Sequence, residues 1–214
     1  SYADGTSVVL TATPGAGQTF TGWSGACSGS GSTCTVSMTG AKTISATFTV
    51  NSYALTVTAL TGGSVATSGG STGIDCGSDC TDTYTHGTSV QLTATAATGY
   101  TFSSWTGCTS VSSNVCTVSM TAARSVVAAF VVQTFTLTVA TPSNGTITGP
   151  GINCWNDASK DCTETFAYGT IVSLVATPST GYGFSSWTNC DSLATSSTCF
   201  LTQRLSLSGR GICC

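Results

Sequence analysis

Charged side chains are scarce in this sequence. They make up 6% of the 214 residues, with 5 Lys and Arg against 8 Asp and Glu, and the net charge is −3. A nucleic-acid-binding protein needs clustered basic side chains to neutralise phosphates, so that class is excluded. A surface with few charges repels its neighbours only weakly, which favours self-association.

Long apolar runs are also missing. No segment of the sequence approaches the roughly 20 apolar residues that a membrane-spanning helix requires. No stretch has the pattern of a secretory leader, so we interpret the sequence as a mature or excised segment. We expect no membrane span.

Histidine occurs once, at His86. It falls in an expected loop, and the matching residues of the repeat described below are Asp4 and Tyr168, which indicates loose requirements at this position. A lone loop histidine is more often solvated than a general base. No serine lies in a nucleophile-elbow pattern. The sequence therefore predicts no catalytic residues and no enzymatic activity.

Cysteine, in contrast, is abundant, with 12 residues that lie mostly in close pairs. Such pairing is typical of a disulfide framework formed in an oxidising compartment. Zinc is the alternative, but zinc sites usually combine two such pairs and often add histidine. The adjacent Cys213 and Cys214 cannot bridge each other without strain. The spacing predicts five disulfides: Cys27 with Cys34, Cys76 with Cys80, Cys108 with Cys116, Cys154 with Cys162, and Cys190 with Cys199.

One sequence segment occurs in three similar copies. It begins at Gly5, Gly87 and Gly169, so the period is 82 residues. Aromatic landmarks keep the same step: Trp23, Trp105 and Trp187. A fixed period of this kind marks an array of similar modules.

Each copy alternates apolar and polar residues, as half-buried strands do. We expect a core-facing row in every copy: Val8, Leu10, Ala12; Val90, Leu92, Ala94; Val172, Leu174, Ala176. The stretches "YALTVTALTGGSVATSG" and "FTLTVATPSNGTITGPG" each have the pattern of a hairpin around a Gly-containing turn. No segment has a helical period. The sequence predicts an all-β fold of tandem, small, disulfide-linked β-sheet repeats.

The pattern "YxxGTxVxLTATPxxGxxFxxWxGxC…CTVxM…xxAxF" resembles the bacterial surface repeat called the divergent InlB B-repeat, and the match covers nearly the whole chain. The resemblance implies an extracellular or cell-surface protein whose compact β-rich modules, similar to β-grasp domains, are strung as a stalk. It implies no enzymatic activity and no fixed ligand. The repeats are therefore expected to be β-grasp-like or β-sandwich-like.

The two ends depart from the repeat. We predict a partial repeat at 1–50, a repeat at 51–132, and a repeat at 133–214 whose final strand is degenerate. Three interpretations of these ends stay open: the segment was cut from a longer array, its tail is aberrant, or another molecule completes an end. An open sheet edge invites another strand, so the third interpretation predicts chains that join head to tail by strand addition into a filament. The degenerate strand places Gly209, Gly211 and Cys213 where the preceding copy has Val126, Ala128 and Phe130.

Acidic residues gather at one repeated place. Several carboxylates on a flexible loop are what calcium prefers, although the spacing is unlike that of an EF-hand. The alternative is that these residues cap turns and solubilise the loop. Six of the eight acidic residues belong to this candidate calcium site: Asp75, Asp79, Asp82, Asp157, Asp161 and Glu164.

The aromatic residues admit two interpretations. The three repeated tryptophans are either apolar plugs beside a cysteine pair or platforms for a sugar ring. Trp155 has no counterpart in the second copy and lies between Cys154 and Cys162, so it is the better candidate for recognition. The stretch Asn144-Gly145-Thr146 fits the N-glycosylation acceptor pattern.

These observations favour a structural role. We predict an extracellular stalk, spacer or filament segment whose partners are copies of itself or neighbouring repeats. The alternative is an adhesin-type module that binds glycans or a surface or matrix protein. Exposed, clustered aromatic side chains would favour the second.

Overall fold

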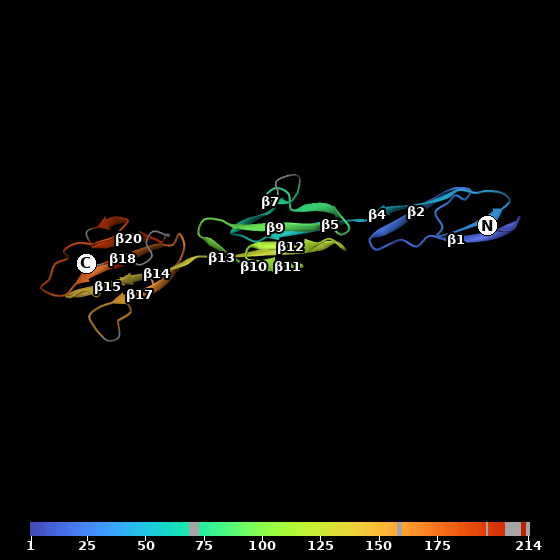
Figure 1. Ribbon diagram of the computed structural model, residues 1–214. Coiled ribbons are helices and arrows are strands. Elements are labelled where there is room, and N and C mark those ends of the chain that lie inside the picture. The colour runs from blue at the N-terminus through green and yellow to red at the C-terminus, as the bar shows by residue number, and fades with distance from the viewer. Residues whose placement is uncertain (69–72, 158–159, 196, 204–210, 213–214) are drawn as a thin grey trace. The chain divides into compact units, whose positions relative to one another are not determined.

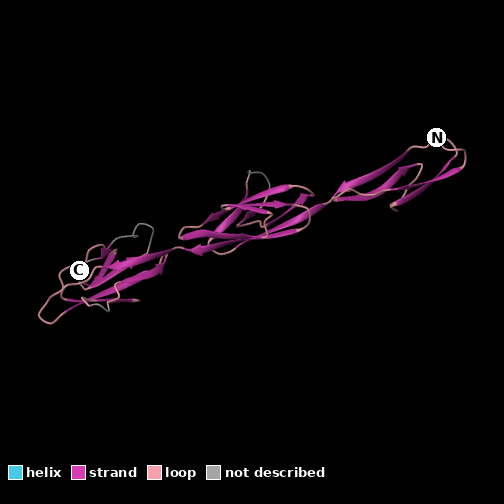
Figure 2. Cartoon of the chain, turned by 60° about the horizontal axis from the view of Figure 1, so that its bottom comes forward, coloured by secondary structure: helices cyan, strands magenta, loops and turns pink. Residues whose placement is uncertain are grey.

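The computed structural model describes residues 1–68, 73–157, 160–195, 197–203 and 211–212. These residues form strands joined by turns and loops, with no helix among them (Figure 2), which confirms the all-β prediction. The chain divides into two compact units: Ser1–Leu60, Ser64–Thr95 and Ser104–Ala128 form the first, and Thr61–Gly63, Ala96–Ser103 and Ala129–Cys214 form the second.

Repeat 1 contains four strands: β1 (Thr6–Thr11), β2 (Gln18–Gly25), β3 (Thr33–Met38) and β4 (Ile44–Val50). β1 pairs antiparallel with β3, and β2 pairs antiparallel with β4 around a bulge after Phe20. The predicted alternation is present, since Val8 and Leu10 are at least half-buried and Ala12 is buried, whereas Val9 between them is exposed.

Repeat 2 contains two larger sheets, drawn from cyan to yellow in Figure 1. One sheet has the order β10-β13-β5-β8 and the other has the order β11-β12-β9-β6-β7. Antiparallel pairs dominate, but β13 lies parallel to β5. The strands are β5 (Ser52–Ala59), β6 (Gly63–Thr67), β7 (Asp75–Cys76), β8 (Thr81–Thr85), β9 (Ser89–Ala96), β10 (Tyr100–Thr106), β11 (Ser110–Ser112), β12 (Val115–Ser119) and β13 (Arg124–Val132).

Repeat 3 follows the same plan. Its sheets have the orders β17-β14-β21 and β16-β15-β18-β20-β19. Side chains from both sheets, including Leu137, Ile147 and Leu174, form one buried cluster, so the arrangement is β-sandwich-like. The strands are β14 (Thr134–Val139), β15 (Gly145–Gly149), β16 (Ile152–Cys154), β17 (Thr163–Ala167), β18 (Ile171–Pro178), β19 (Ser192–Thr195), β20 (Thr198–Thr202) and β21 (Gly211–Ile212).

The hairpins predicted at the start of repeats 2 and 3 are wrong. β5 and β6 follow one another in sequence but belong to different sheets, and so do β14 and β15. Leu55 of β5 and Val65 of β6 are both fully buried. An alternating strand buries its apolar face equally well beside its neighbour or across a sandwich, so the pattern identified the buried side chains but not the pairing.

The last strand differs between repeats 2 and 3. β13 places Ser125 beside Thr56 of β5. One period later, β21 places Gly211 beside Thr138 of β14. Gly211 therefore occupies the place of Ser125.

The prediction had placed Gly211 at the position of Ala128, three residues further along the strand. Its register is corrected accordingly. The two other positions of that prediction, Gly209 and Cys213, lie outside the described residues. The segment 182–187, which matches β10, forms no strand in repeat 3.

The structure contains the disulfides that the spacing predicts: Cys27–Cys34, Cys76–Cys80, Cys108–Cys116, Cys154–Cys162 and Cys190–Cys199. Each closes a short loop. On the chain-entropy estimate, a loop of this size contributes about 2–3 kcal/mol to stability. A small domain gains much from such links because its core is limited.

Candidate functional site

The first candidate site is the place where repeat 1 meets repeat 2. Gly17, in the turn between β1 and β2, accepts the backbone N–H of Asn51 through its carbonyl at 2.8 Å. The carbonyl of Asn51 then accepts the N–H of His86, also at 2.8 Å. The Asn51 side chain is held as well, because its Oδ1 accepts the Thr19 hydroxyl at 2.6 Å. We call this set of contacts the first repeat junction.

The first junction also contains an aromatic ring that packs against its glycine. The imidazole of His86 lies against Gly17 and leaves no room for a Cβ there. Gly17 also has φ +66°, a conformation that favours glycine. The imidazole also meets Tyr53 in an edge contact, with 5.9 Å between ring centroids. A side chain at residue 17 is thus excluded by both space and backbone.

The second repeat junction reproduces the first after one period. The carbonyl of Gly99 accepts the N–H of Gln133, and the carbonyl of Gln133 accepts the N–H of Tyr168, each at 2.8 Å. The Tyr168 ring lies against Gly99, which has φ +81°. Phe135 packs beside that ring at 6.4 Å between centroids. The same geometry therefore holds an imidazole in one junction and a phenol in the other.

The junction shows what sequence reasoning missed at His86. The sequence suggested a solvated loop histidine, but the side chain is half-buried, and its Nδ1 is buried with no hydrogen-bond partner among the described residues. The ring acts in packing. A usable signal was present: a glycine at 17 and 99 is matched by a ring at 86 and 168.

The tryptophans and cystines form a second recurrent arrangement. In each repeat, one cysteine of a disulfide lies opposite a leucine of the neighbouring strand: Cys34 of β3 opposite Leu10, Cys116 of β12 opposite Leu92, and Cys199 of β20 opposite Leu174. Trp23 is half-buried, donates its Nε1–H to Gly31 O at 2.9 Å, and packs 5.3 Å from Phe20. Trp187 is half-buried against the core of repeat 3. These contacts suit apolar plugs, and a role in sugar stacking stays a hypothesis.

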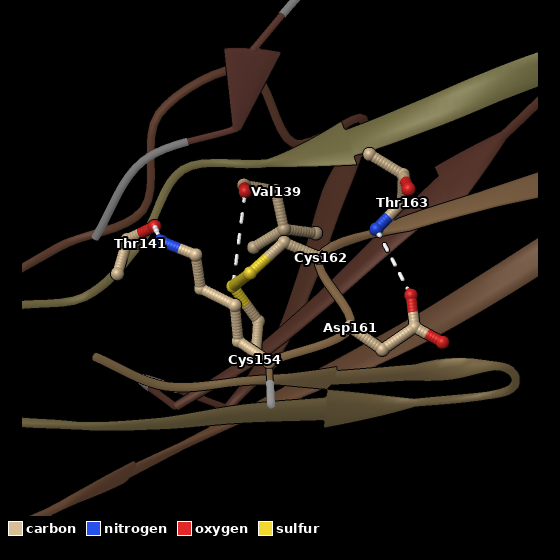
Figure 3. The surroundings of a disulfide bond; sticks show 7 residues. Val139, Thr141, Cys154, Asp161, Cys162 and Thr163 are labelled. Carbon is tan, nitrogen blue, oxygen red and sulfur yellow. Dashed lines mark hydrogen bonds between the residues drawn. A yellow bond between two sulfur atoms is a disulfide. The ribbon is translucent and has the colours of Figure 1, made fainter. Parts of the chain in front are cut away.

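Trp155 lies directly after β16 and is half-buried. Its carbonyl accepts the N–H of Asp157 at 3.0 Å, which shapes the loop that the Cys154–Cys162 disulfide closes. The Cys154 sulfur lies 3.8 Å from the carbonyl oxygen of Val139 (Figure 3), so the loop is fixed to the β14 side of the sandwich. Recognition by Trp155 stays a prediction.

Four acidic residues of the candidate calcium site accept a backbone N–H from a residue one or two positions further along the chain: Asp79, Asp82, Asp161 and Glu164. The Asp161 carboxylate accepts the N–H of Thr163 at 3.4 Å (Figure 3), and Asp79 accepts the N–H of Thr81 in the same way at 3.2 Å. Asp82 and Glu164 each accept the N–H of the following residue. In the part of the chain that the structure describes, no three His, Cys, Asp or Glu side chains gather to hold a metal.

One ionisable group of this locus is perturbed. Burial raises the pKa of Tyr84 to about 12, and the neighbouring Asp82 carboxylate adds to the shift. The corresponding residue of repeat 3 is Phe166, which has no hydroxyl. Repeat 2 thus carries a titrating group that repeat 3 lacks.

The described residues contain no helix of the length and hydropathy needed to cross a membrane.

Comparison with known proteins agrees with the repeat. Segments 1–52, 53–134 and 135–204 each match the model of the divergent InlB B-repeat domain. The chain belongs to this family. A solved structure titled "The Bacillus anthracis TIE protein" is similar at 10% identity and a TM-score of 0.41, over 92% of this chain and 41% of that one. The chain thus spans less than half of that protein's length. No curated protein matches the sequence.

The family and the five disulfides are consistent with an extracellular or cell-surface location.

Proposed function

We propose that this chain is a structural segment of an extracellular stalk or spacer, in which divergent InlB B-repeats are connected by stiff junctions. The observation that supports the proposal is the repeated junction, with its two main-chain hydrogen bonds and its ring on a glycine. Flexible linkers, by contrast, are Gly- and Ser-rich segments without fixed contacts.

The contacts explain why such a junction resists bending. The connecting residue, Asn51 or Gln133, is held on both sides, because its N–H donates to one repeat and its carbonyl accepts from the next. A bend at this residue has to break a hydrogen bond or lift the ring of His86 or Tyr168 from its glycine. Family membership and the all-β fold favour a non-enzymatic role of this kind.

Stiffness can be tested by NMR in a weakly aligned medium. If the junctions hold, residual dipolar couplings from the three repeats fit one common alignment tensor. The variant Gly17→Val with Gly99→Val forces both rings away, so its repeats should require separate tensors. Gly181→Val is the control, since Gly181 has φ +88° and no atom within 4 Å of the place of a Cβ.

A native chain that already requires separate tensors would contradict the stalk proposal. A separate experiment, electron microscopy of the native material, distinguishes single stalks from the polymerised filaments that the sequence analysis also considered. Filaments would appear as particles much longer than a single chain.

A further inference from the structure

Repeat 3 contains a cavity of about 210 Å³ between the β14–β15 turn and the segment that follows β18. Its walls include the apolar Pro142, Pro178 and Phe184. The rim carries Tyr182, whose side chain is 58% exposed. An aromatic ring that is open to solvent at the mouth of a cavity offers a contact face to a ligand.

Repeat 2 has the same turn but uses its tyrosine differently. There the Tyr100 ring lies over Gly62, where it leaves no room for a Cβ. In repeat 3 the residue at this position is Asn144, so a ring cannot occupy the corresponding place. Tyr182, the counterpart of Tyr100, is left exposed.

The backbone around the two tyrosines is nevertheless alike. In repeat 2, the N–H of Ala97 donates to Gly62 O at 2.8 Å, and the N–H of Tyr100 donates to Ala97 O at 3.0 Å. In repeat 3, Ser179 donates to Asn144 O and Tyr182 donates to Ser179 O, both at 3.0 Å. The exchange of glycine for asparagine, on an unchanged turn, accounts for the different position of the ring.

The lining indicates the chemistry of the ligand. None of the described residues that line the cavity is charged, and hydroxyl and amide groups come from Asn144, Thr146, Thr177 and Ser185. A phosphate or carboxylate would find no cation here, and a metal ion would find no carboxylate. A purely apolar ligand would leave these polar groups without partners.

The remaining class is a neutral molecule with an apolar face and several hydroxyl groups, which describes a pyranose ring. The volume supports a single ring, because pockets for larger drug-sized ligands have roughly 300–1,000 Å³. We propose that this cavity binds one pyranose residue of a glycan, with its apolar face on Tyr182 and its hydroxyl groups on Thr146, Thr177 and Ser185. This goes beyond the stalk proposal and does not depend on it.

The sugar can come from two sources. It can belong to a glycan on another surface, or it can be attached to Asn144 itself, which begins the acceptor sequence Asn144-Gly145-Thr146 and is exposed at the cavity. The chemistry of the contact with Tyr182 is the same in both cases. The experiment therefore has one arm for each source.

In the first arm, the oxidised, unglycosylated chain is titrated with methyl glycosides of glucose, galactose, mannose and N-acetylglucosamine, and amide shifts are followed by NMR. We expect saturable shifts around residues 142–146 and 182–185 for at least one sugar. Tyr182→Ala should weaken that binding at least about tenfold, as expected when a central aromatic contact is truncated. Tyr2→Ala is the matched control, because Tyr2 is 61% exposed but does not line the cavity.

A second variant separates binding from folding. Asn144→Gly installs the residue of repeat 2, so Tyr182 gains the space that Tyr100 uses. We expect the Tyr182 ring to become less accessible to a photochemical NMR probe and sugar binding to fall at least about tenfold, while the other resonances stay unchanged.

In the second arm, the chain isolated from its native source is mapped by mass spectrometry at Asn144. A hexosamine there, with ring protons shifted upfield by Tyr182, supports the attached source, and saturable binding in the first arm supports the free one. The proposal is overturned if neither is found, or if binding survives Tyr182→Ala. These results do not affect the alignment-tensor measurement, so the two proposals fail separately.

Discussion

In repeat 2, the sheet of β10, β13, β5 and β8 places Val126 and Ala128 of its parallel strand in the core, with no exposed surface. In repeat 3, the matching sheet has β17, β14 and the two-residue β21 among its described strands. The five-stranded sheets of the two repeats, in contrast, have the same order of matching strands. Leu92 and Leu174, which lie at matching places in these sheets, are both fully buried.

One sheet of a repeat is therefore constant between repeats 2 and 3, and the other sheet is variable. The sheet built around β9 or β18 supplies a constant core, with a leucine opposite a cystine. The other sheet varies, because β10 and β13 of repeat 2 are matched in repeat 3 by residues 182–187, which form no strand, and by the two-residue β21. Each junction joins the turn that holds Gly17 or Gly99 to the ring of His86 or Tyr168, which follows β8 or β17 in the next repeat.

The largest expected effect tests whether the two cores are equivalent. Leu92→Ala and Leu174→Ala should each lower the free energy of unfolding of their own repeat by about 2–5 kcal/mol, because each leaves a cavity in a close-packed core. Urea unfolding followed by tryptophan fluorescence measures the loss. Val111→Ala, at a side chain that is 54% exposed, should change stability by less than about 0.5 kcal/mol. A much smaller loss for Leu174→Ala would show that the core of repeat 3 is looser.

The next prediction compares Gly99, which is covered by the Tyr168 ring, with Gly181, the matching glycine of repeat 3, which has no atom within 4 Å of the place of a Cβ. Gly181→Ala should cost about 1–2 kcal/mol, the cost of a Cβ at positive φ. Gly99→Ala carries that cost and also displaces the Tyr168 ring, which adds about 1–3 kcal/mol. Thermal unfolding of both variants measures the difference. Equal losses would mean that the ring contributes nothing to the junction.

A smaller effect distinguishes the repeats at alkaline pH. The unfolded chain releases the Tyr84 proton near pH 10, whereas the folded chain keeps it to about pH 12. The unfolded state therefore binds fewer protons in this window, and the free energy of unfolding falls as the pH rises from 10 to 12.

Tyr84→Phe, which copies Phe166 of repeat 3, should remove this part of the slope while leaving stability at pH 8 close to that of the unmodified chain. The measurement is urea unfolding at a series of pH values. An unchanged slope in Tyr84→Phe would assign the loss to other groups.

The smallest expected effect concerns the acidic loci. If the carboxylates serve their own turns, the exposed substitutions Asp79→Ala and Asp161→Ala should each lower the free energy of unfolding by less than about 0.5 kcal/mol, and a chelator should leave the melting temperature unchanged. If they bind calcium, the chelator lowers the melting temperature of the unmodified chain alone, because a ligand of the native state stabilises it.

Much of the fold could be predicted from the sequence, because alternation and spacing are local properties. Val90, Leu92 and Ala94 are buried as expected, and the paired cysteines are close enough in sequence to identify one another. The parallel pairing of β13 with β5 could not be predicted, since alternation marks the buried face of a strand but not its neighbour.

The contacts of the two repeat junctions could not be predicted from the sequence for a related reason. The fit between Gly17 and His86 joins residues of two different repeats, and neither residue has a distinctive pattern around it. The exposed position of Tyr182 likewise depends on Asn144, which lies far away in sequence. Such pairs become visible only when copies are compared at the 82-residue step.

The junction also bears on how the gene can grow. One repeat supplies the glycine and the following repeat supplies the ring, while the connecting residue stands between them. A tandem duplication of 82 residues therefore creates a complete new junction at once, and a deletion of 82 residues rejoins two compatible halves. Unequal recombination can lengthen or shorten the array without a compensating substitution, so selection is free to act on its length.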